Sequence, residues 1–443
     1  MSAAFAFASS RDPDARLGFS AALLQGLAPD GGLYVPAAWP RLTAEDFAGG
    51  AGLVEVATLL LAPFLAGDRL APELASLAEE AFTFPATLVP IQADGRLSVL
   101  ELFHGPTAAF KDFGARFLAA CFARLRGAGA RALTILVATS GDTGGAVAAA
   151  FHQRPGIEVA VLFPKGLVSP TQERQLTCWG GNVRSLAVRG TFDDCQRLVK
   201  DAFLDPGLRA RGALSSANSI NLGRLLPQAV YYAATSLAVW REFGEPASFV
   251  IPSGNLGNSL ACLWARQVGL PIGAVVLAHN ANRTVPDYLA SGEWRPRPSV
   301  ATLASAMDVG NPSNMERLRA LYPQLPELRQ ALSAVSVGDE EIRERIRAGF
   351  RTYGQIWCPH TATAAEAWER LPPEQRAHGR WVLVSTAHPA KFREIVEPLI
   401  GRSVPMPESL ARLFARPVQC VEIDATLGSL RAALETRGDQ WTS

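Results

Sequence analysis

The sequence predicts an open, doubly wound α/β fold preceded by a separate, mixed and largely helical N-terminal domain. At 443 residues the chain is long enough for two or three domains, and 48% hydrophobic with 19% charged residues excludes a disordered chain. From about residue 130 onward, short apolar and β-branched runs alternate with stretches of helical periodicity. This alternation is typical of repeated βαβ units, and the first 95 residues lack it.

The predicted strands are apolar on both faces, as in a parallel sheet that helices cover on each side. They span residues 132–139, 158–163, 183–188, 248–252, 272–278, 335–337 and 381–385. The helices predicted between them span residues 192–204, 225–243, 339–353 and 363–371. In the N-terminal domain, helices are predicted at residues 51–65 and 72–82, and a turn rich in glycine and proline at residues 29–32.

Charge and cysteine usage exclude several classes of partner. With 42 Lys and Arg against 41 Asp and Glu, the net charge of +1 creates no field that would attract nucleic acid or an anionic membrane. No apolar tract is long enough to span a bilayer, and the N-terminus lacks the pattern of a secretory signal. The six cysteines form no Cys-x-x-Cys pair, so we expect no metal site, no disulfide framework and a cytoplasmic location.

Two glycine-rich turns each follow a predicted strand and precede a predicted helix, at residues 141–145 and 253–258. Backbone N–H groups and the positive end of a helix dipole can bind an anion at such turns. Neither turn matches a dinucleotide fingerprint or a P-loop, and any α/β protein has glycine turns. Two of them at the carboxyl ends of strands nevertheless predict phosphate or carboxylate sites.

Only four lysines occur, so each can be considered separately. Lys200 fits a solvated helix face, whereas Lys391 would start a helix, where a cation needs a nearby anion. Lys165 follows a predicted strand and could meet an anion of the substrate. Lys111 is flanked by aromatic residues, and an apolar pocket would lower its pKa and allow a Schiff base. The alternative for Lys111 is an extended side chain beside Asp112 with its amine in solvent.

Seven segments resemble the threonine synthases, a family of pyridoxal-phosphate enzymes that shares its fold with tryptophan synthase β and threonine dehydratase. They are residues 26–36, 104–114, 140–145, 216–221, 252–258, 306–309 and 386–392. The resemblance implies fold type II, in which the cofactor lies between two doubly wound open-sheet lobes. It also implies an N-terminal domain at residues 1–95, a catalytic region at 96–400 and a C-terminal segment at 401–443 that packs on the catalytic region.

The resemblance implies pyridoxal 5'-phosphate as the cofactor and Lys111 as the Schiff-base lysine. Thr386 would form a hydrogen bond with the pyridine nitrogen, and one loop would hold the cofactor phosphate: Gly254, Asn255, Leu256, Gly257 and Asn258. Related enzymes often carry asparagine, facing the cofactor's phenolic oxygen, where Asp142 stands. Because an ionised Asp142 would repel that oxygen, either its carboxylate turns toward a cation or a backbone N–H, or another residue faces the oxygen.

The substrate residues are also implied by the resemblance. Ser140, Gly141, Asp142 and Thr143 would bind the substrate carboxylate or lie at the phenolic oxygen. The candidates around the substrate phosphate are Lys165, Ser169, Asn218, Ser219, Asn221 and Arg224. The implied reaction is a β,γ-replacement that converts O-phospho-L-homoserine and water to L-threonine and phosphate. This is the last step of threonine biosynthesis, carried out by a monomer or a homodimer.

Three alternative functions compete with this one. A phospho-lyase would release 2-oxobutyrate, ammonia and phosphate, and only product analysis separates it from a synthase. A non-catalytic homologue would bind a ligand or partner, although an intact Lys111 argues against it. A nicotinamide dehydrogenase would need a glycine fingerprint that the chain lacks. His104 and His388 lie in matched segments and are read as loop-orienting residues rather than catalytic ones.

Overall fold

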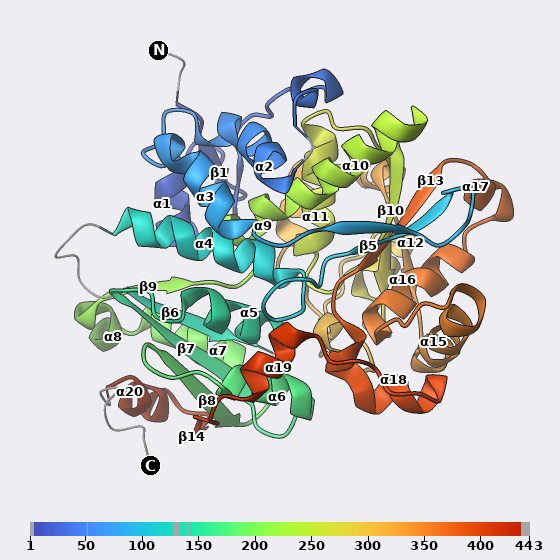
Figure 1. Ribbon diagram of the computed structural model, residues 1–443. Helices are drawn as coiled ribbons and strands as arrows, with labels where there is room; N and C mark the ends of the chain where they lie inside the picture. Colours follow the sequence, from blue (N-terminus) through green and yellow to red (C-terminus); the bar gives the residue numbers. More distant parts are fainter. Residues whose placement is uncertain (1–3, 51, 127–132, 140, 436–443) are drawn as a thin grey trace.

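A six-stranded sheet forms one lobe of the molecule (Figure 1). The computed structural model describes residues 4–50, 52–126, 133–139 and 141–435. The strand order is β12-β11-β10-β13-β5-β4, and β4 alone in this sheet runs antiparallel to its neighbour. Its strands are β4 (Thr87–Pro90), β5 (Leu97–Glu101), β10 (Ala247–Pro252), β11 (Ile272–His279), β12 (Ser333–Ser336) and β13 (Arg380–Ser385).

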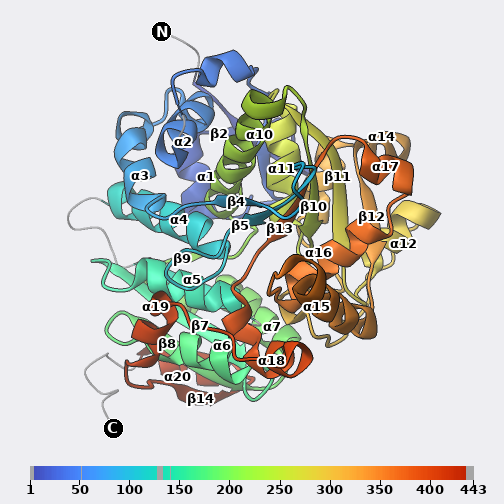
Figure 2. The ribbon, with the colours of Figure 1, turned by 45° about the vertical axis from the view of Figure 1, so that its right-hand side comes forward.

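A five-stranded, fully parallel sheet forms the second lobe, which lies below the first in Figure 2. The strand order is β14-β8-β7-β6-β9. Its strands are β6 (Leu133–Ala138), β7 (Ile157–Pro164), β8 (Val183–Arg189), β9 (Ala213–Ser216) and β14 (Val421–Asp424). The C-terminal segment therefore supplies one of the two edge strands of this sheet. The two open sheets confirm the predicted fold class.

Helices cover these sheets, and their bounds are as follows: α4 (Lys111–Leu125), α5 (Asp142–Phe151), α6 (Pro170–Thr177), α7 (Phe192–Leu204), α8 (Pro206–Arg211), α9 (Leu222–Leu225), α10 (Ala229–Phe243), α11 (Gly257–Gln267), α12 (Thr284–Ser291), α13 (Met315–Leu321), α14 (Leu325–Ala331), α15 (Asp339–Tyr353), α16 (Pro359–Glu369), α17 (Pro373–Ala377), α18 (Arg393–Ile400), α19 (Glu408–Phe414) and α20 (Leu427–Glu435). No helix in these described ranges combines the length and apolar character needed to cross a membrane.

The N-terminal part has its own small antiparallel sheet with the order β2-β1-β3. Its elements are β1 (Phe7–Ser9), β2 (Arg16–Leu17), α1 (Phe19–Gln25), β3 (Tyr34–Pro36), α2 (Leu53–Leu61) and α3 (Leu74–Ala81). Helix α3 packs on α4, and α2 packs on α10. Strand β4 falls within the range assigned from the sequence to the N-terminal domain, yet it pairs inside the six-stranded sheet. The sheet topology thus ends the N-terminal part before Thr87.

One predicted helix is divided in the structure. The helical pattern over residues 225–243 contains Pro227, and a 3₁₀ turn at Leu226–Gln228 separates α9 from α10. Proline lacks the N–H that a continuous α-helix needs, so the regular α-helical hydrogen bonding is interrupted there. Helix α9, which precedes this turn, crosses α4 very closely: a Cβ at Gly114 would lie only 2.4 Å from the carbonyl oxygen of Arg224. This close crossing places Arg224 beside the helix that begins at Lys111.

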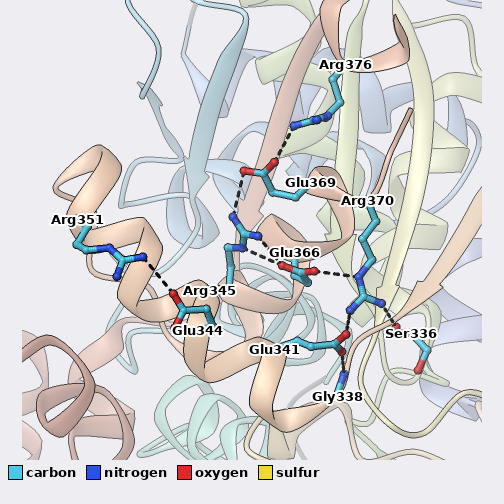
Figure 3. A network of polar contacts seen from close by, with 10 residues as sticks. All are labelled: Ser336, Gly338, Glu341, Glu344, Arg345, Arg351, Glu366, Glu369, Arg370 and Arg376. Carbon is cyan, nitrogen blue, oxygen red and sulfur yellow. Dashed lines mark hydrogen bonds and ion pairs between the residues drawn. The ribbon is translucent and has the colours of Figure 1, made fainter. Parts of the chain in front are cut away.

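A network of arginines and glutamates joins α15 to α16 (Figure 3). The Arg345 guanidinium donates from Nε and Nη2 to Glu366 at 2.9 and 2.7 Å, and from Nη1 to Glu369 at 3.0 Å. Arg370 reaches the other oxygen of Glu366, and Arg376 reaches Glu369. Arg345 is the central cation of the network, because it alone in Figure 3 bridges both glutamates.

We expect Arg345→Ala to lower the free energy of unfolding by about 1–3 kcal/mol, because two partly buried carboxylates would lose charged hydrogen bonds. Arg351→Ala is the matched control on the same helix. Its exposed pair with Glu344 should be worth less than about 0.5 kcal/mol. Urea unfolding followed by circular dichroism measures both variants, and equal midpoints would contradict a central role for Arg345.

Candidate active site

A cavity of about 1410 Å³ opens between the two lobes. Thr139 and Asp142, which follow β6, line it from the five-stranded lobe. Gly254, which follows β10, and Thr386, which follows β13, line it from the six-stranded lobe. In each sheet the carboxyl ends of the parallel strands share one edge. The residues that follow these edges in both sheets line the same cavity, so turns that are far apart in the sequence meet there.

Lys111 lines this cavity as the first residue of α4. Its side chain is partly buried, and Nζ lies 4.8 Å from the centre of the Phe110 ring. Burial lowers the pKa of Lys111 to about 8; the carboxylate of Asp142 opposes this shift, and the cation of Lys391 adds to it. A lysine in this setting has a reactive neutral amine close to neutral pH.

Backbone pairing joins the Lys111 segment to the Thr386 segment. Ala109 and Ala387 form an antiparallel bridge, and the Phe110 N–H donates to the carbonyl oxygen of Thr386 at 2.9 Å. Two segments separated by more than half of the chain are thereby held side by side. Lys111 and Thr386 consequently line the same cavity.

Asp142 turns toward a cation, which is the first of the alternatives that the sequence left open. Its Oδ1 lies 2.7 Å from Nζ of Lys391 and also accepts from Nε2 of Gln172 at 3.3 Å. Lys391 is fully buried and donates in addition to the carbonyl oxygen of Thr107 at 3.0 Å. Burial opposes ionisation of Asp142, but the ammonium groups of Lys391 and Lys111 hold its pKa below the ordinary value.

Lys391 and His360 are absent from the set of site residues predicted from the sequence. The sequence alone does not assign a partner to Lys391, because its anionic partner, Asp142, is remote in sequence. The signal was a cation at the start of a helix, which calls for a nearby anion. His360 lines the cavity from α16, and its Nε2 accepts from the N–H of Ala306 at 3.1 Å. Burial lowers the pKa of His360 to about 4, so this imidazole is neutral at neutral pH.

The loop before α11 has the features of a phosphate cradle. A Cβ at Gly254 would lie 2.8 Å from Cα of Met307, so only glycine fits the close approach of the two segments. Asn258 accepts at Oδ1 from the hydroxyl groups of Tyr231 and Tyr232, at 2.5 and 2.9 Å. Its Nδ2 is buried and has no partner in the described part of the chain. An unused donor at the N-terminus of a helix fits the phosphate of pyridoxal phosphate.

All five residues predicted for this cradle line the cavity: Gly254, Asn255, Leu256, Gly257 and Asn258. Leu256 takes a left-handed conformation with φ of 64° directly before the helix starts. The cradle and Lys111 therefore face the same space. Within the described ranges, no group of three His, Cys, Asp or Glu side chains is arranged to hold a metal ion.

Four of the predicted substrate residues also line the cavity: Thr143, Asn218, Ser219 and Arg224. Arg224 is buried, and its Nη1 donates to the carbonyl oxygen of Ala217. Its Nε is buried and has no partner among the described residues. Burial lowers the pKa of Arg224 to about 10, which leaves it a cation at neutral pH. Residues 217–221 form what we call the substrate segment. Ser219 in this segment accepts from Nδ2 of Asn255 at 2.7 Å, so the substrate segment contacts the cradle.

Two other predicted substrate residues, Lys165 and Ser169, do not line the cavity. Lys165 is half-exposed and forms an ion pair with Glu422. Ser169 caps α6 by accepting from the N–H of Gln172 at 3.2 Å. Both positions follow β7, at the same edge of the sheet as the cavity, yet their side chains are engaged elsewhere. Sequence reasoning could place them at that edge but could not see these partners.

Three further positions complete the predicted set. Asn221 is buried and caps α9 by accepting from the N–H of Gly223 at 3.0 Å, so it shapes the substrate segment from outside the cavity. Gly141 precedes α5 and does not line the cavity. Ser140 lies outside the described residues.

Comparison with known proteins identifies the relatives of this chain. Residues 90–387 match the family model described as pyridoxal-phosphate dependent enzyme. Residues 6–82 match the threonine synthase N terminus, and residues 361–434 match the threonine synthase C-terminal model. Threonine synthase from Haemophilus influenzae is 41% identical over 96% of this chain and 98% of its own length. The Escherichia coli K12 enzyme is 38% identical over 95% and 97%.

Solved structures agree with these relatives over the whole chain. The crystal structure of threonine synthase from Escherichia coli matches with a TM-score of 0.88 and 36% identity, covering 97% of this chain and 99% of that one. A threonine synthase structure from Brucella melitensis with bound pyridoxal phosphate matches with a TM-score of 0.89 and 34% identity, covering 99% and 100%. The chain therefore belongs to the pyridoxal-phosphate-dependent enzymes and, within them, to the threonine synthase family.

Proposed function

We propose that the protein is a threonine synthase that converts O-phospho-L-homoserine and water to L-threonine and phosphate. The observation that carries this proposal is one cavity that joins a lysine of lowered pKa to two separate places for phosphate. One place is the cradle at residues 254–258, and the other lies at Arg224 with Asn218 and Ser219. A phosphorylated cofactor acting on a phosphorylated amino acid needs both.

The cofactor is pyridoxal 5'-phosphate, which when bound stabilises negative charge at Cα of the substrate. Lys111 would hold its aldehyde carbon, and the cradle with Nδ2 of Asn258 would hold its phosphate. Thr386 would face the ring nitrogen. A neutral hydroxyl at that position does not force the nitrogen to be protonated, as a carboxylate would.

Lys111 is the proposed base of the reaction. Its amine, once free, removes a proton from Cα of the substrate and later one from Cβ. Phosphate then leaves from Cγ, a proton is delivered to Cγ, the hydroxyl of a water molecule adds at Cβ and a proton returns to Cα. A pKa of about 8 suits this task, because the amine can both accept and return a proton near neutral pH.

The substrate's two anionic groups have different proposed partners. Arg224, Asn218 and Ser219 would bind the phosphate, while Thr143 at the N-terminus of α5 would bind the carboxylate. Asp142 lies in the same turn, and its pairing with Lys391 reduces its repulsion of an anion there.

We further propose that the enzyme acts in the cytoplasm as a monomer or a homodimer. All six cysteines are free, and five of them are buried, which suits a reducing compartment.

Product analysis tests the proposed reaction. Cofactor-loaded protein is incubated with O-phospho-L-homoserine, and the carbon product is identified by NMR while phosphate release is measured. We expect threonine and phosphate to form in equal amounts. Release of 2-oxobutyrate with phosphate would instead establish a lyase, and the absence of both products would reject this substrate.

We expect Lys111→Ala to lose at least about a thousandfold in phosphate release, because both the attachment point and the base would be gone. After borohydride reduction, mass spectrometry should find the cofactor mass on the Lys111 peptide of the wild type and none in the variant. Lys165→Ala is the matched lysine control, since its ammonium is paired with Glu422 outside the cavity. Wild-type turnover in Lys111→Ala would remove Lys111 from the mechanism.

The lowered pKa of Lys111 predicts a specific pH profile. Only the neutral amine reacts with trace acetic anhydride, so labelling of Lys111 in cofactor-free protein should rise with pH and level off above about pH 8. An ordinary lysine would continue to gain reactivity up to a pKa of about 10.4. Peptide mass spectrometry measures the rate, and an unbroken rise beyond pH 9.5 would contradict the lowered pKa.

A further inference from the structure

A buried arginine lies directly behind the substrate segment, outside the cavity. Arg317 on α13 is fully buried, and its guanidinium donates to neutral oxygens alone among the described residues. The acceptors are the carbonyl oxygens of Tyr34 at 2.9 Å, Ser219 at 3.2 Å and Ile220 at 2.6 Å, and Oδ1 of Asn314 at 2.8 Å. The four contacts use four of its five N–H donors, and none of them is to a carboxylate.

The nearby carboxylates are committed to other partners. Glu316, which adjoins Arg317 in the chain, accepts from Nε of Arg11 at 2.9 Å and from the hydroxyl of Ser10 at 2.5 Å. Asp112, whose charge acts on Arg224, accepts from the backbone N–H and the hydroxyl of Thr107 at 2.9 and 2.6 Å. Neither carboxylate forms an ion pair with a buried guanidinium in the described part of the chain.

Two buried cations thus border the same segment. Arg224 contacts the carbonyl oxygen of Ala217, and Arg317 contacts those of Ser219 and Ile220. Keeping an unpaired charge in a protein interior is costly unless an opposite charge arrives. The phosphate of the proposed substrate is such a charge, because it would bind where Asn218 and Ser219 face the cavity.

The helix that carries Arg317 also joins the substrate segment to the cofactor cradle. Asn314, which precedes α13, donates from Nδ2 to the carbonyl oxygen of Asn255 at 3.0 Å and to the hydroxyl of Ser219 at 3.3 Å. Arg317 holds the other end of this amide through Oδ1. Its contact with Tyr34 extends the connection to β3 of the N-terminal part.

We propose that Arg317 is a positioning residue for the substrate phosphate, holding the segment at residues 217–221 and supplying positive charge from behind it. The inference rests on the proposed function for the identity of the anion. Arg317 does not line the cavity, so it acts through Ser219 and Ile220 rather than by touching the substrate. The field of an unpaired cation in a poorly solvated interior reaches across such a short segment.

Binding of two probes to the cofactor-loaded enzyme tests this role. Inorganic phosphate reports on the anion site, and L-threonine reports on the rest of the substrate site because it lacks phosphate. We expect Arg317→Gln to weaken phosphate binding roughly ten- to thirtyfold and to raise KM for O-phospho-L-homoserine similarly. Binding of L-threonine and kcat should change less than about threefold. Arg317→Lys keeps the charge but loses the planar fork, and should restore part of the phosphate affinity.

Arg266 on α11 provides a matched control. Its guanidinium also donates to neutral oxygens, namely the carbonyl groups of Gly273 and Ala331 and the hydroxyl of Tyr322. It does not line the cavity. Arg266→Gln should therefore leave phosphate affinity within about twofold of the wild type, which separates a general loss of packing from a loss at the anion site.

Several outcomes would overturn the proposal. Unchanged phosphate affinity in Arg317→Gln would show that its charge does not reach the site, and an equal loss of phosphate and L-threonine binding would show a role in scaffolding alone. If Arg317→Gln does not fold, Arg317→Lys decides: a several-fold loss confined to phosphate supports the proposal, and no such loss rejects it. If the wild-type enzyme releases no phosphate from O-phospho-L-homoserine, the proposed function fails. The role of Arg317 is then still tested by comparing the affinity of the wild type and of the Arg317 variants for inorganic phosphate.

Discussion

The buried ion pair between Lys391 and Asp142 is the contact on which the geometry of the site depends. Asp142 begins α5, which packs on β6 and β7 of the five-stranded sheet, and Lys391 follows β13 of the six-stranded sheet, so the pair connects the two lobes at the cavity. Both side chains are almost fully buried, where a single unpaired charge would be very unfavourable. The pair therefore joins the two lobes at the cavity, and it keeps a carboxylate beside Lys111 from acting as a free negative charge.

The protein attracts an anionic ligand through individual cations placed near the cavity, not through an overall positive charge. The net charge is +1, and many of the arginines form ion pairs on the surface or between helices, as the network of α15 and α16 shows. Arg224 and Arg317, in contrast, are buried and contact neutral oxygens. Surface charges are screened by solvent and salt, whereas buried charges act strongly on a ligand nearby. A phosphorylated substrate can thus be bound selectively by a protein that is nearly neutral as a whole.

The long parallel strands could be predicted because each is an apolar run, buried on both faces. Within the two lobes the prediction missed β4, β5, β9 and β14, which have five residues or fewer and are partly polar or partly exposed. It also named none of the three short strands of the N-terminal part. Strand β4 also shows why the N-terminal boundary could not be placed from sequence: it joins the six-stranded sheet through pairing with β5, and pairing leaves no local pattern. Pro227 interrupts a helical pattern that looked continuous in its hydrophobic period.

By itself, the sequence determined the α/β class, the two glycine turns and the unusual surroundings of Lys111, because strand composition, turn chemistry and neighbouring aromatics are local properties. Its resemblance to a family added the cofactor and the reaction. Only the tertiary structure decided which polar side chains meet: it paired Asp142 with Lys391, engaged Lys165 with Glu422 away from the cavity and placed Arg317 behind Ser219. Contacts between residues a hundred or more positions apart depend on how strands are ordered in the sheets, and no local pattern in the chain encodes that order.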